Sequence, residues 1–259
     1  MKYTIYILFF LSAIINAQDS IQTSFIKETV FKANDLISID NFETIYYVNN
    51  NVFSKKTANK TITYNNIQLG NLTFANAFNP LKINLFYKDF NTVIILDNRL
   101  AEIFKIDFNT LTPYKNVSYV STGSDNTVWL FNQDLQKLEL FDYKSKTIRA
   151  QTLPVQSQVL DLKSNYNYCW LLTQKFLYMY NYFGSLVKKI KNEGYTSIVE
   201  SNENIILKSE NALFYLKKDA DKPQPIKTSN LLINQFFVTN QTLYIYSHET
   251  LQQLQLKIK

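Results

Sequence analysis

The chain of 259 residues has very few of the side chains on which most catalytic and metal sites depend. It has one cysteine, Cys169, and one histidine, His248. A disulfide within the chain and a histidine-rich metal site are therefore excluded. A Ser-His-Asp triad would have to use His248, which lies in a polar turn and is expected at the surface. We accordingly expect no metal ion, no cofactor and no catalytic residue set of these kinds.

Glycine and arginine are also scarce. Four glycines leave no glycine-rich loop of the kind that cradles phosphate groups. Only Arg99 and Arg149 are arginines among the 27 basic residues, and the lysines are scattered rather than gathered in one stripe. The formal charge of +6 is thus spread along the chain. This pattern argues against a nucleic-acid partner, which favours a concentrated basic surface.

The N-terminus has the pattern of a secretory signal peptide. Lys2 precedes an apolar stretch that runs from Ile5 to Ile15, and the small residue Ala17 follows it. A membrane span needs about 20 apolar residues, so this stretch is short for an anchor. We interpret residues 1–17 as a signal peptide, with an uncleaved anchor as the alternative, and residues 18–259 as one domain.

A turn followed by an apolar run recurs six times along the rest of the chain. The turns are Asn41–Thr44, Asp89–Thr92, Ser124–Thr127, Asn165–Tyr168, Ser201–Asn204 and Thr239–Thr242. Their last residues are 48, 35, 41, 36 and 38 residues apart. A period near 40 that is built of short strands is typical of propeller blades. The sequence therefore predicts an all-β, six-bladed β-propeller with four-stranded blades.

Each unit is predicted to hold a first strand before the turn, an apolar second strand after it, and two outer strands. In the second unit this places the first strand at Lys82–Tyr87, the fourth at Leu111–Tyr114 and an inserted loop at Asn65–Pro80. The last unit ends after its third strand, whereas Gln22–Phe31 is an additional strand ahead of the first unit. We therefore expect the N-terminal strand to close the ring by joining the C-terminal blade.

One unit carries a recognisable motif. The segment Asp125–Phe131, followed by Leu138–Tyr143, resembles the blade repeat of regulator-type and NHL-like propellers. The composition, rich in Lys, Asn, Ile and Tyr, together with the leader, is similar to that of secreted propeller proteins of Bacteroidetes. This resemblance implies an exported protein in the periplasm or at the cell surface of a Gram-negative bacterium, peripheral to the membrane at most.

Asp97 and Arg99 are the candidate ligand-binding residues. We place them in a loop between second and third strands, on the face where the chain also enters each first strand, which is the usual ligand face of propellers. Trp129 and Trp170 lie in second strands and are expected in the core. The tyrosines of the third strands and loops either form a recognition surface or pack between blades; they are Tyr178, Tyr180, Tyr182 and Tyr246.

Two functions are the main hypotheses from the sequence; a third, a sensory or regulatory propeller detached from its kinase, has no signalling module in this sequence to support it. The first is a non-enzymatic binding or scaffolding propeller that acts on an envelope protein partner, either as a monomer or within a hetero-complex. The alternative is a carbohydrate-active enzyme with a carboxylate pair at the central face, about 5 to 9.5 Å apart. Paired carboxylates would favour the enzyme, whereas aromatic and apolar groups at that face would favour binding.

Overall fold

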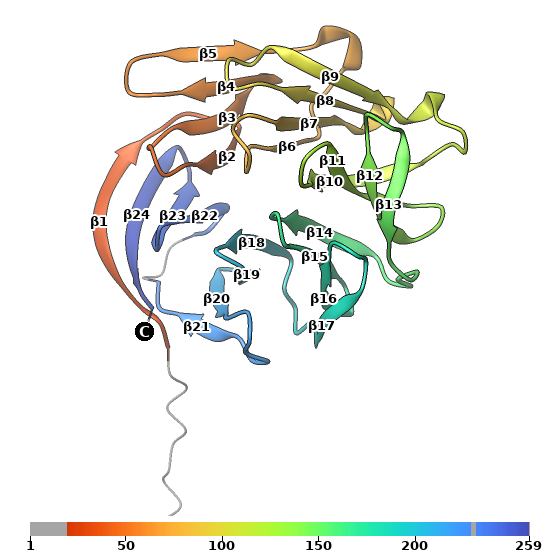
Figure 1. The fold of residues 1–259 in the computed structure, drawn as a ribbon. Coiled ribbons are helices and arrows are strands. Elements are labelled where there is room, and N and C mark those ends of the chain that lie inside the picture. Colours follow the sequence, from red (N-terminus) through yellow and green to blue (C-terminus); the bar gives the residue numbers. More distant parts are fainter. Residues whose placement is uncertain (1–19, 229–231, 259) are drawn as a thin grey trace, which may run out of the picture.

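The computed structural model describes residues 20–228 and 232–258 (Figure 1). The described chain is a six-bladed β-propeller, in which six antiparallel sheets of four strands each surround a central axis. The predicted signal peptide lies outside the described residues. No helix in the described part is long and apolar enough to cross a membrane.

The blades are numbered here in chain order, each from its inner strand outward. Blade 1 holds β2 (Asp35–Ile39), β3 (Ile45–Asn49), β4 (Val52–Lys56) and β5 (Thr61–Tyr64). Blade 2 holds β6 (Phe74–Asn76), β7 (Ile83–Tyr87), β8 (Thr92–Leu96) and β9 (Glu102–Asp107), and blade 3 holds β10 (Val117–Thr122), β11 (Thr127–Asn132), β12 (Lys137–Asp142) and β13 (Thr147–Gln151). Blade 4 holds β14 (Val159–Ser164), β15 (Tyr168–Thr173), β16 (Phe176–Asn181) and β17 (Leu186–Lys191). Blade 5 holds β18 (Ser197–Ser201), β19 (Asn204–Ser209), β20 (Ala212–Leu216) and β21 (Gln224–Ile226). Blade 6 holds β22 (Gln235–Thr239), β23 (Thr242–Ser247), β24 (Thr250–Lys257) and the N-terminal β1 (Gln22–Val30). Three short 3-10 helices, η1 (Ile67–Leu69), η2 (Lys88–Phe90) and η3 (Phe108–Thr110), lie in connections.

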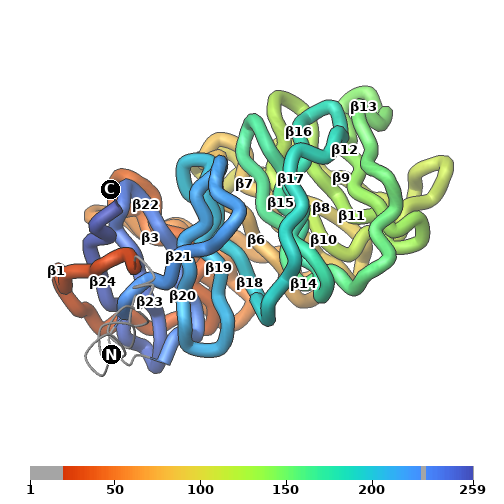
Figure 2. Tube along the Cα trace, turned by 90° about the horizontal axis from the view of Figure 1, so that it is seen from below, coloured from red at the N-terminus to blue at the C-terminus, as the bar shows by residue number. Residues whose placement is uncertain are grey.

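The predicted ring closure is confirmed. β1 pairs antiparallel with β24, and Figure 2 shows the two strands side by side at one end of the molecule. Ile21 forms a parallel bridge to Ile226 of blade 5, and the Thr23 hydroxyl donates to the Lys227 carbonyl at 2.6 Å. The N-terminal strand thus completes blade 6 and also contacts blade 5.

Blade 2 differs from the prediction by one strand. The segment 65–80 is no inserted loop, because it holds η1 and the inner strand β6. Ile83–Tyr87 is therefore the second strand and Thr92–Leu96 the third, while 111–114 forms no strand. With this correction the inner strands begin 38 to 43 residues apart, which is more even than the spacing of the turns. Both β7 and β8 are buried along their whole length, so their residues show no alternation that separates a second from a third strand.

The core lies between adjacent blades. Phe86 and Val93 of blade 2 pack with Val120 and Phe141 of blade 3, and equivalent clusters fill the other junctions. Second strands are almost continuously buried because a neighbouring sheet covers each of their faces. Trp129 and Trp170 lie in this core, as predicted.

Asparagine replaces glycine in many of the hairpin turns. Two-residue hairpin loops of type I′ require positive φ at both central positions, a conformation that asparagine tolerates well. Asn50 and Asn51 have φ of 46° and 65°, and Asn202 and Asn240 take the first position of similar turns. A propeller with so few glycines is possible for this reason.

Candidate binding site at the central cavity

The inner strands enclose a cavity of about 690 Å³ at the centre of the ring. Its described lining comes from β2, β6, β14, β18 and β22, together with the turns that follow most of them. Clefts of about 300 to 1,000 Å³ are typical of ligand sites. The cavity is therefore the first place to look for function.

Hydrogen bonds join the inner strand of blade 3 to the inner strands on both sides of it. The Asn76 amide of blade 2 donates to the Ser121 hydroxyl of blade 3 at 3.2 Å. The Ser164 hydroxyl of blade 4 lies 2.8 Å from the same Ser121 oxygen. These buried contacts join three inner strands, and no described residue of β10 lines the cavity.

One ion pair within the inner strand of blade 4 lines the cavity. Lys163 Nζ lies 2.9 Å from Asp161 Oδ1 and sits over the Phe74 ring of blade 2, 5.0 Å from its centroid. The second carboxylate oxygen of Asp161 accepts the Ile198 N–H of blade 5 at 3.0 Å. Asp161 is therefore neutralised by its lysine and fixed by the neighbouring blade.

Asp40 shapes the turn that ends β2. Its Oδ1 accepts the backbone N–H groups of Phe42 at 2.8 Å and Thr44 at 2.9 Å. This side-chain-closed turn is the conformation that aspartate favours at the start of hairpins. It presents Phe42 to solvent, with 90% of the side chain exposed.

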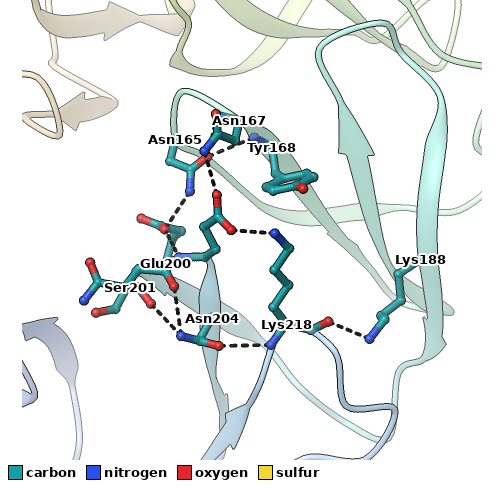
Figure 3. A network of polar contacts seen from close by, with 10 residues as sticks. Asn165, Asn167, Tyr168, Lys188, Glu200, Ser201, Asn204 and Lys218 are labelled. Atoms are coloured by element: carbon teal, nitrogen blue, oxygen red, sulfur yellow. Dashed lines mark hydrogen bonds and ion pairs between the residues drawn. The ribbon is translucent and has the colours of Figure 1, made fainter.

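Glu200 joins the cavity to a polar network between blades 4 and 5 (Figure 3). Its Oε1 accepts the Asn165 amide at 2.9 Å and the Glu203 backbone N–H at 2.8 Å. Burial raises the pKa of Glu200, and these two hydrogen bonds oppose that shift only in part. Glu200 is thus a half-buried carboxyl group that faces no basic side chain in this network.

The outer part of the network is an ion pair that fixes the same turn. Glu203 Oε2 lies 2.6 Å from Lys218 Nζ, and its Oε1 accepts the Asn167 amide at 2.6 Å. The hydrogen bond from Lys218 is the main cause that lowers the pKa of Glu203. Lys218 also sits over the Tyr168 ring, 4.5 Å from its centroid. This arrangement holds the backbone N–H that contacts Glu200.

Three exposed aromatic side chains surround one end of the cavity. We call Phe42, Phe78 and Tyr166 the aromatic rim; they are 90%, 42% and 48% exposed. They lie in the connections from first to second strands of blades 1, 2 and 4, so they share one face of the ring. Phe78 and Tyr166 pack edge to face, with centroids 5.2 Å apart, and Phe42 and Phe78 also line the cavity.

Asp97 and Arg99 lie elsewhere. They occupy the turn between β8 and β9, the third and fourth strands of blade 2, rather than a second-to-third loop. Their position differs from the prediction because the strands of blade 2 were assigned one strand out of step. Asp97 and Arg99 therefore lie on the same face as the aromatic rim, whereas the prediction placed them on the opposite face. Asp97 Oδ1 accepts the Arg99 and Ala101 N–H groups at 2.8 and 2.9 Å, and the latter is the main cause that lowers its pKa. Neither residue lines the cavity.

The tyrosines considered as a recognition surface pack between blades. Tyr180 belongs to the cluster between blades 3 and 4, and Tyr178 and Tyr182 pack against it. The Tyr246 hydroxyl accepts the Ala33 N–H at 3.0 Å and contacts the carbonyls of Phe31 and Ala33. These tyrosines therefore stabilise the ring.

Glu200 and the aromatic rim were not predicted from the sequence. Phe42 and Tyr166 each occupy the second position of a repeated turn, where a polar residue is usual, and Phe90 takes the same position in the turn of blade 2. An aromatic side chain at that position was the available signal. The sequence around Glu200 has no such signal, because its position in the cavity depends on how the blades assemble into the ring.

No protein-family model matches the chain, and no curated protein matches it in sequence. Solved propellers are similar to it in structure. Virginiamycin B lyase from Staphylococcus aureus is 13% identical with a TM-score of 0.59, over 85% of this chain and 79% of the lyase chain. A catalytically inactive histidine-to-alanine variant of that lyase has been solved with quinupristin. In this chain His248 lies in the exposed turn between β23 and β24 and does not line the cavity.

Two further structures belong to larger assemblies. PorZ of Porphyromonas gingivalis, described as an essential bacterial surface component of the type-IX secretion system, is 12% identical with a TM-score of 0.52. That match covers 86% of this chain and 31% of PorZ. A chain of the Mitotic Checkpoint Complex is 9% identical with a TM-score of 0.58, over 93% and 94% of the two chains. At such identities these similarities show a shared propeller fold and nothing more specific.

Proposed function

We propose that this chain is a non-enzymatic binding propeller that holds a protein partner at the mouth of its central cavity. The observation that carries this proposal is the aromatic rim, three exposed rings at the entrance of a large cavity. Aromatic side chains are enriched in interfaces and dominate their binding energy, because they bury a large area at low entropic cost. Phe42 is almost completely exposed and lines the cavity together with Phe78, so its ring is not an isolated apolar residue on the surface.

The place of action that we propose is the bacterial envelope. Residues 1–17 support export, and the fold is shared with a Bacteroidetes surface component and with a protein of a large complex. In this proposal the exported chain is peripheral to the membrane at most and works as a monomer or within a hetero-complex. Its partner is another envelope protein, not a nucleic acid.

A carbohydrate-active enzyme is the second candidate, and one observation favours it. Asp161 contacts the N–H of Ile198, two residues before Glu200 on β18, and both carboxylates line the cavity. The backbone positions of Ile198 and Glu200 on β18 are about 7 Å apart, so the Asp161 carboxyl group lies near the strand that carries Glu200. Against this candidate, Asp161 is neutralised by Lys163. Hydrolysis of an envelope glycan that is lost in both Asp161→Asn and Glu200→Gln would establish the enzyme.

The binding proposal is tested by a quantitative affinity purification of the tagged protein from cross-linked native envelopes. Phe42→Ser removes the most exposed ring of the rim. Leu153→Ser is the matched control, because Leu153 is 84% exposed and lies in the link from blade 3 to blade 4, on the opposite face. We expect a near-stoichiometric partner that is lost with Phe42→Ser and retained with Leu153→Ser. Equal recovery with both variants would contradict the proposal.

A further inference from the structure

We propose that the partner inserts a lysine or arginine side chain into the central cavity, where its positive group forms an ion pair with the Glu200 carboxylate. This inference rests on the proposed function and specifies its ligand. The occupant is one basic side chain on an extended segment of the partner protein. The aromatic rim packs against the residues that flank this side chain.

The charge of the cavity is opposite to that of the whole chain. Among the described lining residues there are four carboxylates and one lysine, a formal charge of −3, whereas the chain as a whole carries +6. A cavity lined by charged residues in the proportions of the whole chain would be basic. The negative lining therefore complements a cation, and it disfavours phosphate and other anionic ligands.

Of the three carboxylates that are partly buried, Glu200 has the most capacity left for a ligand; the fourth, Asp35, is exposed to solvent. Asp161 is paired with Lys163, and Asp40 accepts two N–H groups of its own turn at Oδ1 and the Tyr46 hydroxyl at Oδ2, at 3.4 Å. Asp35 accepts the Gln235 amide at 3.3 Å near the other end of β2. Glu200 uses only Oε1 for Asn165 and Glu203, and no described residue donates a hydrogen bond to Oε2.

A basic side chain would relieve the unfavourable state of Glu200. A carboxylate accepts about four hydrogen bonds, and a partly buried one without a cation is disfavoured relative to water. An ammonium or guanidinium group that donates to Oε2 would form a charge-assisted hydrogen bond in a site of reduced dielectric constant. A metal ion is a poorer occupant, because no group of three acidic, histidine or cysteine side chains is assembled anywhere in the described residues.

The walls of the cavity suit the rest of such a side chain. Val199 of β18 and Phe237 of β22 line the cavity and are only partly buried. The methylene stem of lysine or arginine packs on apolar surface while its head reaches a polar group. At the mouth, the rings of Phe42 and Phe78 offer faces that attract cations. The flanking residues of an extended segment would cover these rings.

The test uses two defined peptides that differ in charge alone. The probes are acetyl-Tyr-Arg-Tyr-amide and its citrulline analogue, which keeps the shape of arginine without the positive charge. Their affinities are measured by titration calorimetry on the purified protein, on Glu200→Gln, and on Glu193→Gln. Glu193 is the matched control, since it is exposed in the link to blade 5 on the opposite face and lines no part of the cavity.

We expect the arginine peptide to bind the unmodified protein at least tenfold more tightly than the citrulline peptide. Glu200→Gln should remove this difference, and Glu193→Gln should leave it unchanged. Equal binding of both peptides to the unmodified protein, or no binding of either, overturns the inference even if Glu200→Gln is too unstable to purify. In that event loss of the envelope partner in Phe42→Ser still supports the binding site, whereas its retention overturns the proposed function as well.

Discussion

The ion pair between Lys115 and Glu139 provides the sharpest test of how the blades are held together. Lys115 lies in the link from blade 2 to blade 3, and Glu139 lies in the middle of β12. Their side chains are 6% and 0% exposed, and Lys115 Nζ is 2.6 Å from Glu139 Oε2. The Lys115 carbonyl also accepts the Asn91 amide of blade 2 at 2.6 Å. The pair thus fixes the link to both blades.

Removal of one partner leaves a buried charge without compensation. Such losses cost about 3 to 5 kcal/mol of unfolding free energy. Lys115→Met should fall near the lower end, because Lys137 Nζ remains 4.0 Å from Glu139 Oε1 and is 18% exposed. Glu139→Gln should fall higher, since Lys115 then has no anion. At about 2 to 4 °C per kcal/mol for a chain of this size, a loss of about 3 kcal/mol lowers the Tm by roughly 6 to 12 °C.

The assay is urea unfolding of the two single variants and the double variant, followed by tryptophan fluorescence. Both tryptophans are buried, so their emission reports the loss of the core. We expect the double variant to be less destabilised than the sum of the single variants, by about 2 kcal/mol or more, because neither charge is then left alone. Costs below about 1 kcal/mol for both single variants, or strict additivity, would refute this reasoning.

Three further predictions concern the fold and its titration. Deletion of residues 20–31 should abolish soluble protein, because it uncovers β24 and removes Ile21 from the core of blades 5 and 6; a soluble deletion variant with the original Tm would refute the closure. Gly184→Ala should destabilise by about 1 to 3 kcal/mol more than Gly194→Ala in chemical unfolding. Both glycines have positive φ, but a Cβ at Gly184 would overlap the Gln151 carbonyl, whereas at Gly194 the nearest atom is 3.6 Å away; equal costs would be inconsistent with this contact. The raised pKa of Glu200 means that the folded state binds a proton more readily than the unfolded state. The unfolding free energy of the unmodified protein, relative to that of Glu200→Gln, should therefore fall as the pH rises from about 4.5 through the pKa of Glu200 in the folded state, and then become constant. A difference in unfolding free energy that does not change with pH would argue against a buried carboxyl group.

The sequence predicted the blades well because the ring repeats one local pattern. Continuous burial of second strands produces runs such as that around Trp129, and each run starts after a turn with polar side chains. The closure by β1 followed from counting strands, since the last unit lacked one. These features are encoded locally, so they can be recognised without knowledge of the contacts between blades.

The error in blade 2 has a local cause as well. β6 contains only three residues, and two adjacent ones, Ala75 and Asn76, are both buried, so the strand shows no alternation of buried and exposed positions. The turn Asp89–Thr92 joins second and third strands, yet it has the polar composition of a first-to-second turn. Because the faces of a propeller alternate with each connection, this shift by one strand moved Asp97 and Arg99 to the wrong face.

The cavity was beyond prediction because it depends on contacts between blades. Asn76, Ser121 and Ser164 link the inner strands of blades 2, 3 and 4. Residues more than 40 positions apart set this geometry. Glu200 becomes a site residue only once the ring has closed around it.

The central claim is that the mouth of the cavity contacts the partner, and site-specific photo-cross-linking in living cells tests it most directly. A benzophenone side chain would replace Phe42 in one variant and Leu153, on the opposite face, in another. The account predicts one cross-linked partner from position 42, attached through a segment that contains lysine or arginine, and none from position 153. Cross-links of the same partner from position 153 alone, or equally from both positions, would contradict it.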